Sequence, residues 1–356
     1  MNLPKQKGLP INLLSACFNN TVATYKFYWF LSIIQSIENG QTRILKRNLF
    51  ARMISNAWFT VNYFKVSFGK QDLIGQVTNN LKTIEKIDID EKFENIFSRL
   101  RLSSNRETER FLLHFDKNVP HWFLSPWFPK SSNETDSTRE KRIYKESKIF
   151  AEKSIYGLYE KEIEVNPEWI EYLTVNARML KDFCYWNLAL YLQAKNPNVP
   201  DIPNKLIKPA VRGSLSKQRN FWDVVFDELG TIKCIYTGKE LVRENYAVEH
   251  FIPYNFVSHD LIWNLIPADR SFNSTKSDKL PSIDKYFNPF FDLQKTAIQI
   301  LKDKNPKNKL LEDYLTIFSD LNEIQELPLA FTKEKFKERI LPLITIASNN
   351  GFEFLL

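Results

Sequence analysis

The sequence predicts a mainly α-helical protein with a small α+β insert in its C-terminal half. Apolar residues recur at helical spacing from Leu13 to about Lys195, and glycine is scarce, with 9 in 356 residues. One later stretch, Tyr246 to Phe251, is instead rich in residues that favour strands. With 43% hydrophobic residues, a chain of 356 residues is long enough to build two packed cores.

Breaks in this pattern divide the chain into four parts. A helical N-terminal domain is expected over 1–195, and a polar loop at 131–142 would divide it into two subdomains. Three prolines within 197–203 stop the last helix and favour an extended connection, so a linker is predicted over 196–220. The α+β domain should occupy 221–288, followed over 289–356 by a helical C-terminal segment that packs on it.

Charge and cysteine content restrict the classes of function. The chain has 49 Lys and Arg against 42 Asp and Glu, a net charge of +7 that would assist contact with phosphates without establishing it. Its 3 cysteines lie far apart and form no CxxC pair, so neither a disulfide framework nor structural zinc is expected. The apolar stretch Phe27 to Ile34 is too short to span a membrane and predicts a buried helix. We therefore expect a cytoplasmic protein that makes no use of a membrane.

The predicted linker is basic, because between Asp201 and Asp223 it contains only cationic charges: Lys205, Lys208, Arg212, Lys217 and Arg219. Lys208 and Arg212 are the candidate contacts to nucleic-acid phosphates, and a solvated linker is the alternative.

Two other segments also have two possible interpretations each. The aromatic segment His121 to Pro129 could stack on unpaired bases or pack in the core. The cluster Arg43, Lys46, Arg47 and Arg52 could follow a phosphate backbone or form a solvated helix face.

The most informative stretch is Val248-Glu249-His250-Phe251-Ile252-Pro253, which is followed by Asp260, Asn264, Asn273 and Lys276. The order of propensities around it is strand, polar turn, strand and helix, with the elements expected at Tyr246 to Phe251, Asn255 to Asp260, Leu265-Ile266 and Ser271 to Lys279. Adjacent residues on a strand point to opposite faces. Glu249 and His250 could therefore serve one site only from a strand end or a bulge, and Pro253 favours an end.

These residue types suit the hydrolysis of a phosphodiester, which needs a base, a cation and groups that hold the phosphate. His250 suits the base because an imidazole titrates near about 6.5 and its neutral form is available at neutral pH. Glu249 and Asn273 offer oxygen ligands of the kind that Mg²⁺ prefers. Asn264 suits an orienting role through its amide, and Lys276, one helical turn after Asn273, can reach phosphate oxygens.

This stretch resembles the HNH, or ββα-metal, endonuclease family, whose motif reads acid-His, a central Asn and a final His or Asn on a helix. It is most similar to the HNH domain of RNA-guided CRISPR effector nucleases, over about Thr231 to Ser282, where Cys234 to Lys239 look like the usual lead-in. The resemblance implies that His250 is the general base and Asn264 the central orienting residue. It also implies that Glu249 and Asn273 hold one divalent ion, Mg²⁺ with Mn²⁺ as a substitute.

The sequence departs from the family pattern at two points. Glu stands at position 249, where Asp is commoner, and the zinc-binding cysteine pairs of many HNH proteins are absent. The resemblance does not reach the RuvC-like or guide-binding parts of CRISPR effectors, so RNA guidance is not inferred.

As a function, the resemblance implies a metal-dependent DNA endonuclease whose helical N-terminal domain has a recognition or regulatory role. Stand-alone HNH proteins of this size often belong to restriction or anti-phage systems, which would add a protein partner from a defence system. One alternative is a nucleic-acid-binding or interaction protein with an inactive HNH fold, and another is an RNase that uses the same site. One active site cuts one strand at a time, so a double-strand break would need a homodimer or two encounters.

Overall fold

A computed structural model describes residues 3–19, 21–208, 213–320, 322 and 329–355. The chain divides into two compact units. Unit 1 comprises Met1–Pro197 with Ile202–Lys208, and unit 2 comprises Asn198–Asp201 with Pro209–Leu356. Each unit has its own buried apolar core. Within the described ranges, no helix is both long and apolar enough to cross a membrane.

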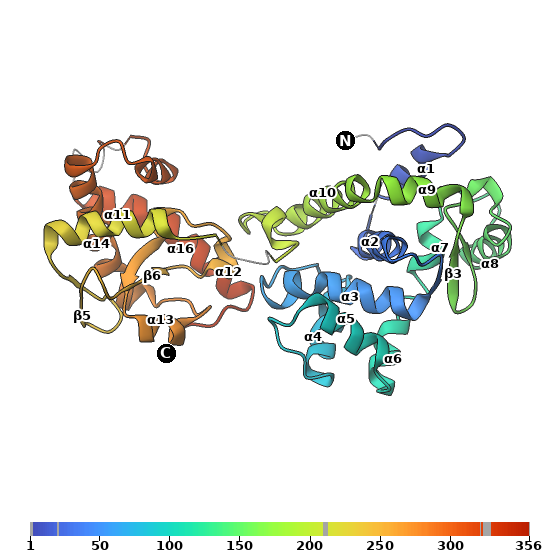
Figure 1. Cartoon of the computed structure of the whole chain (residues 1–356), viewed down its shortest axis with the longest axis horizontal. Coiled ribbons are helices and arrows are strands. Elements are labelled where there is room, and N and C mark those ends of the chain that lie inside the picture. Colours follow the sequence, from blue (N-terminus) through green and yellow to red (C-terminus); the bar gives the residue numbers. More distant parts are fainter. Residues whose placement is uncertain (1–2, 20, 209–212, 321, 323–328, 356) are drawn as a thin grey trace. The chain divides into compact units, whose positions relative to one another are not determined.

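Unit 1 consists of helices and one small antiparallel sheet, in which the strand order is β1-β3-β2 (Figure 1). Its helices are α1 (Ile11–Ala16), α2 (Tyr25–Glu38), α3 (Lys46–Asn62), α4 (Leu73–Ile84), α5 (Phe93–Leu102), α6 (Arg106–Leu113), α7 (Val119–Phe123), α8 (Asp136–Ser147), α9 (Pro167–Val175) and α10 (Ala177–Lys195). The strands and short 3₁₀ helices are β1 (Arg43–Leu45), β2 (Tyr156–Leu158), β3 (Glu162–Val165), η1 (Ala151–Lys153) and η2 (Ile202–Lys205).

The core of unit 1 is built around α2. This helix buries side chains on every face, including the whole stretch Phe27 to Ile34, which is typical of a helix enclosed by others. It packs against α3, where the rings of Trp29 and Phe50 lie 5.6 Å apart. The buried helix predicted for Phe27 to Ile34 is therefore confirmed.

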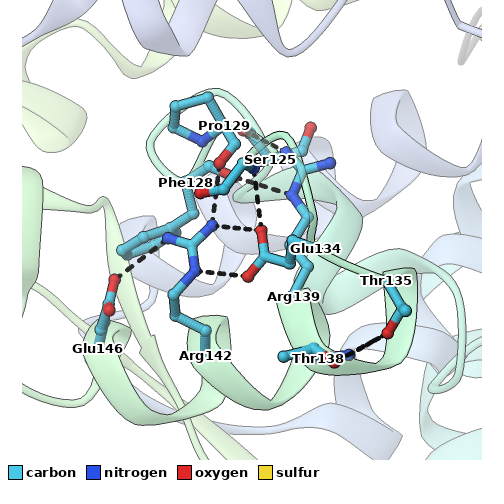
Figure 2. A network of polar contacts seen from close by, with 10 residues as sticks. Ser125, Phe128, Pro129, Glu134, Thr135, Thr138, Arg139, Arg142 and Glu146 are labelled. Atoms are coloured by element: carbon cyan, nitrogen blue, oxygen red, sulfur yellow. Dashed lines mark hydrogen bonds and ion pairs between the residues drawn. The ribbon is translucent and has the colours of Figure 1, made fainter.

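The prediction of a polar loop at 131–142 is only half correct, because helix α8 begins at Asp136. The hydroxyl of Thr135 accepts a hydrogen bond from the backbone N–H of Thr138 and so caps this helix. Arg142 then fastens the preceding turn, since its Nε and Nη2 each lie 2.8 Å from one carboxylate oxygen of Glu134, as Figure 2 shows. A bidentate pair of this kind holds the turn against the helix.

The predicted linker 196–220 is not one extended segment. The helix before it, α10, ends at Lys195, but η2 (Ile202–Lys205) packs on unit 1. The side chain of Lys205 is fully buried, and its carbonyl oxygen accepts a hydrogen bond of 2.9 Å from Oγ1 of Thr60. At the other end, α11 already begins at Ser216. The proline spacing predicted the end of a helix correctly but could not show this packing.

Unit 2 contains two antiparallel strand pairs, β4-β5 and β6-β7, and several helices (Figure 1). Its helices are α11 (Ser216–Leu229), α12 (Tyr254–Val257), α13 (Arg270–Lys276), α14 (Ile283–Lys304) and α16 (Leu329–Asn349). The strands and 3₁₀ helices are β4 (Ile232–Lys233), β5 (Glu240–Leu241), β6 (Ala247–His250), β7 (Leu265–Ala268), η3 (Ile262–Asn264) and η4 (Lys309–Thr316). The expected order of strand, turn, strand and helix is present as β6, α12, β7 and α13.

The C-terminal half of unit 2 supports β7. Gln294 of α14 donates from Nε2 to the carbonyl oxygen of Leu265 at 2.9 Å, and its own carbonyl accepts a hydrogen bond from the Tyr314 hydroxyl. The segment after α13 is held by the end of the chain, because the Leu280 N–H donates to the carbonyl of Glu353 and the Leu355 N–H donates back to Leu280. These contacts fix both flanks of the β6-β7-α13 arrangement.

Candidate active site

Glu249 and His250 lie at the end of strand β6. Antiparallel pairing places Glu249 opposite Ile266 and His250 opposite Leu265 of β7, and the strand ends at His250. Pro253 is the N-cap residue of the short helix α12, which follows it. Both side chains are mostly buried, but they meet different neighbours, as alternation along a strand requires. The expected strand end is therefore present.

His250 pairs with Asp260. Its Nε2 lies 2.9 Å from Oδ1 of Asp260, which belongs to the loop that follows α12. That loop turns at Ser258, whose φ of 57° is left-handed, and the carbonyl of Asp260 accepts a hydrogen bond from Gln218 of α11. A carboxylate in this position favours the imidazole tautomer with its hydrogen on Nε2. The lone pair is then on Nδ1, which becomes the atom that can accept a proton.

Asn264 fixes the loop rather than the imidazole. Its fully buried side chain makes two hydrogen bonds to the backbone of Ile252, with Oδ1 accepting from N–H and Nδ2 donating to the carbonyl, both at 2.8 Å. Its own carbonyl accepts from the N–H of Phe251 at 2.7 Å. These bonds join the end of β6 to the start of β7. They hold the two residues after His250 in one conformation.

Glu249 forms a buried ion pair with Lys276 of α13. The Lys276 ammonium lies 2.8 Å from Oε1 of Glu249 and donates a second hydrogen bond of 2.8 Å to the carbonyl of His250. Lys276 is 0% exposed, and burial lowers its pKa while the charge of Glu249 acts in the opposite direction. The phosphate contact expected for Lys276 does not fit this geometry, because the ammonium is enclosed and already has two acceptors.

Helix α13 carries Asn273 on the same side as Lys276, one helical turn earlier, and the helix packs against β6. The helix is capped by Asp269, whose Oδ1 accepts a hydrogen bond of 2.9 Å from the N–H of Ser271. Hydrogen bonds from Lys239 and from Ser271 hold the pKa of Asp269 well below its usual range. The start of α13 is thus tied to the hairpin formed by β4 and β5.

The donor chemistry of Glu249 and Asn273 fits a hard divalent cation. Mg²⁺ is commonly held by one or two protein oxygens while water and substrate phosphate complete its octahedron. Glu249 already holds one cation, the ammonium of Lys276, so this carboxylate is placed to neutralise positive charge. The described ranges contain no group of three or more His, Cys, Asp or Glu side chains suited to a metal. Water and phosphate would therefore supply most of the ligands.

Two features of this site escaped the sequence argument. Asp260, ten residues after His250, was one of several acids near the motif, and only the fold of its loop brings it to the imidazole. Tyr236 stacks on Phe272 of α13, with ring centres 4.8 Å apart, and its hydroxyl has no hydrogen-bond partner among the described residues. Burial raises the pKa of Tyr236, and the negative charge of Glu249 raises it further. Tyr236 thus packs against α13 and also contacts Tyr286 of α14.

Lys208, which was predicted to contact phosphates, belongs to unit 1. The ammonium of Lys208 pairs with Asp90 and lies 4.5 Å from the ring centre of Tyr63, all within unit 1. Arg212 lies outside the described residues. Each cation of the cluster at 43–52 has a partner within unit 1: Arg43 has Glu162 and Glu164, Lys46 has Asp116, Arg47 has the carbonyls of Arg101 and Ser103, and Arg52 lies over Phe97.

Comparison with known proteins bears on the segment that contains this site. A search of curated proteins found no match to the chain, and a search of solved structures found none. Residues 234–282 match a family model described as HNH endonuclease. The matched residues include β5, β6, β7 and α13, and with them Glu249, His250, Asn264 and Asn273. The resemblance to HNH endonucleases is confirmed over this segment, residues 234–282.

Proposed function

We propose that this chain is a divalent-metal-dependent endonuclease that hydrolyses phosphodiester bonds of DNA. The observation that carries the proposal is the pairing of His250 with Asp260 at the end of a strand that also presents Glu249. In this proposal His250 is the base, Asp260 the carboxylate that orients it, and Glu249 the carboxylate that binds the metal. The match of residues 234–282 to the HNH endonuclease family model supports the same reaction class.

In this proposal His250 removes a proton from the attacking water. Asp260 accepts a hydrogen bond from Nε2, so Nδ1 receives the proton, and the carboxylate stabilises the imidazolium that results. Asn264 acts as a positioning residue, because its two bonds to Ile252 hold the backbone that carries the imidazole. Neither residue would contact substrate in this role.

Glu249 and Asn273 would hold the ion. A bound divalent cation, Mg²⁺ or Mn²⁺ in its place, supplies charge neutralisation on the phosphate and on the departing oxygen. Lys276 keeps the Glu249 carboxylate neutralised and α13 fastened to β6. An ion at Glu249 would share that carboxylate with the ammonium, and we expect a modest metal affinity in the absence of DNA.

We further propose that unit 1 recognises the target or a protein partner, as in a restriction or anti-phage defence system acting in the cytoplasm. Lys208 could contact phosphate only by leaving Asp90, and Arg212 stays a proposed phosphate contact. Cleavage of both strands would require a second copy of the chain or a second encounter.

The test is a nicking assay with the full-length chain. Supercoiled plasmid, linear duplex, single-stranded DNA and RNA are incubated with Mg²⁺, with Mn²⁺ and with a chelator. We expect nicked plasmid in the presence of either ion and intact plasmid with the chelator. The His250→Ala variant should cleave about 10²-fold to 10⁴-fold more slowly and bind DNA as before. The matched control is His259→Gln, which replaces the only other histidine in the sequence of unit 2. This variant should cleave at the wild-type rate.

Other outcomes select the alternatives. Preference for RNA would make the chain an RNase that uses the same site. DNA binding without cleavage under any ion would favour an inactive HNH fold in a binding protein. Equal rates for the His250 variant and wild type would remove His250 from the mechanism.

A further inference from the structure

Unit 1 contains a pocket of about 470 Å³ at the meeting point of four helix ends. It lies where α2 and α4 begin and where α6 leads into α7, and its lining includes Tyr25, Lys26, His114, Asn118 and Trp122. This volume is in the range of sites for small molecules, about 300–1,000 Å³. None of these residues belongs to the candidate active site.

The cation in this lining is Lys26. The structure shows no ion-pair partner for it among the described residues, and the described lining contains no carboxylate. Partial burial lowers the pKa of Lys26 from its ordinary value. The buried acid among the described residues of unit 1, Asp72, is already used, since its oxygens accept hydrogen bonds from the amides of Thr24 and Ile74. Lys26 therefore lacks a counter-ion, which an anionic ligand would supply.

Trp122 provides an aromatic wall. Its ring is partly exposed, whereas Phe123, Leu124, Trp127 and Phe128 of the same segment are buried. The guanidinium of Arg139 lies 5.4 Å from the ring centre, and it donates hydrogen bonds to the carbonyls of Phe128 and Ser125, as Figure 2 shows. These contacts hold the segment in place. The ring of Trp122 is thus part of a built surface rather than a loose side chain.

We propose that this pocket binds a nucleotide, with the base against Trp122 and the phosphate at Lys26. Base stacking on an aromatic ring needs no particular base, and the amides of Asn118 and Gln71 can donate to or accept from a base edge. A purely apolar ligand would leave Lys26 buried without a partner, and a cationic ligand would be repelled by it. The nucleotide could be a free molecule or one unit of a single-stranded nucleic acid.

The proposal is tested by calorimetric titration of the full-length chain with a chelator present, so that no cleavage occurs. The ligands are the four ribonucleoside monophosphates, the matching nucleosides, inorganic phosphate and a short single-stranded DNA. We expect saturable binding of at least one nucleotide below about 1 mM. The matching nucleoside and inorganic phosphate alone should each bind at least about tenfold more weakly, because each lacks one of the two contacts.

Two variants and one control assign the contacts. Lys26→Met should weaken binding about tenfold to a hundredfold, and Trp122→Leu about fivefold to a hundredfold. Lys145→Met, an exposed lysine of α8 in the same unit, should bind as wild type does. Circular dichroism confirms that each variant is folded. Binding of the short DNA without binding of free nucleotides would identify a strand as the source and still support the site.

The proposal is wrong if none of the nucleotides and strands binds, or if Lys26→Met binds them as tightly as the wild type. It is also wrong if inorganic phosphate binds as tightly as the nucleotides, since the base would then contribute nothing. This measurement does not depend on nuclease activity, so the pocket and the proposed function can fail separately.

Discussion

The buried pair between Glu249 and Lys276 gives the sharpest quantitative prediction. Replacing Lys276 by Met keeps most of the side-chain volume but removes both hydrogen bonds of 2.8 Å. The Glu249 carboxylate, only 7% exposed, would then be a buried charge without its partner. Breaking a buried pair from one side costs about 3–5 kcal/mol. We expect Lys276→Met to destabilise unit 2 by an amount of this order.

Hydrogen–deuterium exchange on the full chain measures this loss locally, at the amides of β6 and α13. A cost of 3–5 kcal/mol corresponds to protection that falls by about a hundredfold to a few thousandfold. Glu249→Gln combined with Lys276→Met should recover most of the protection, because the double change removes the unpaired charge. Lys304→Met is the control. It breaks an exposed pair with Glu228, and solvent screening should leave protection nearly unchanged.

Two results would refute the reasoning. Protection in Lys276→Met that falls by less than about tenfold would mean that the carboxylate is solvated or protonated at little cost. A double variant as unstable as the single one would show that Lys276 matters through packing rather than through its charge.

Three further predictions concern the ion, the base and acid stability. Glu249→Gln should raise the Mg²⁺ concentration for half-maximal cleavage more than Asn273→Asp does, because the first removes charge and the second adds it, and Mn²⁺ should partly rescue the Glu249 variant. The measurement is the cleavage rate against the Mg²⁺ concentration. If Glu249→Gln leaves the half-maximal concentration unchanged, Glu249 is not a ligand of the ion. Asp260→Asn should slow single-turnover cleavage about tenfold to a hundredfold with DNA affinity unchanged, because a neutral amide no longer stabilises the imidazolium. An unchanged rate would separate Asp260 from the mechanism. The Arg142 guanidinium lowers the pKa of Glu134 from 4.5 to about 2, so this pair stabilises the folded state above pH 4.5 and loses that effect as the pH falls toward 2. Urea unfolding should show Arg142→Met less stable than wild type at pH 6, with a difference that shrinks toward pH 2, and a constant difference would contradict the assignment.

Local sequence patterns predicted the parts of the fold that depend on near neighbours. The apolar run of α2 identified a buried helix, and the propensities around His250 gave the order of strand, turn, strand and helix. The start of α8 was missed because the run from Ser131 to Ser137 has no apolar residue. Its helix depends on a Thr135 cap and on the Arg142 bond to Glu134, which are visible only once the turn is folded.

The site was predictable in its residue types and less so in its contacts. The spacing of His250, Asn264 and Asn273 led to the right segment, but Lys276 was expected to reach phosphate oxygens, whereas its side chain is buried. Its place in the interior depends on how closely α13 packs on β6, a tertiary distance that no spacing records. Asp260 could not be distinguished from nearby acids for the same reason.

The hydrogen bonds that hold β7 and Leu280 limit how this segment could be exchanged between nucleases by recombination. The family match ends at residue 282, yet Gln294 holds the Leu265 carbonyl and the backbone of residues 353–355 pairs with Leu280. A fragment cut at 282 would leave these backbone groups to water and uncover the apolar side chains beneath them. Exchange between proteins should therefore succeed only when the crossover lies before α11 and the donor contributes everything through residue 355. This stretch, from α11 through residue 355, is nearly three times as long as the segment 234–282 by which the family is recognised.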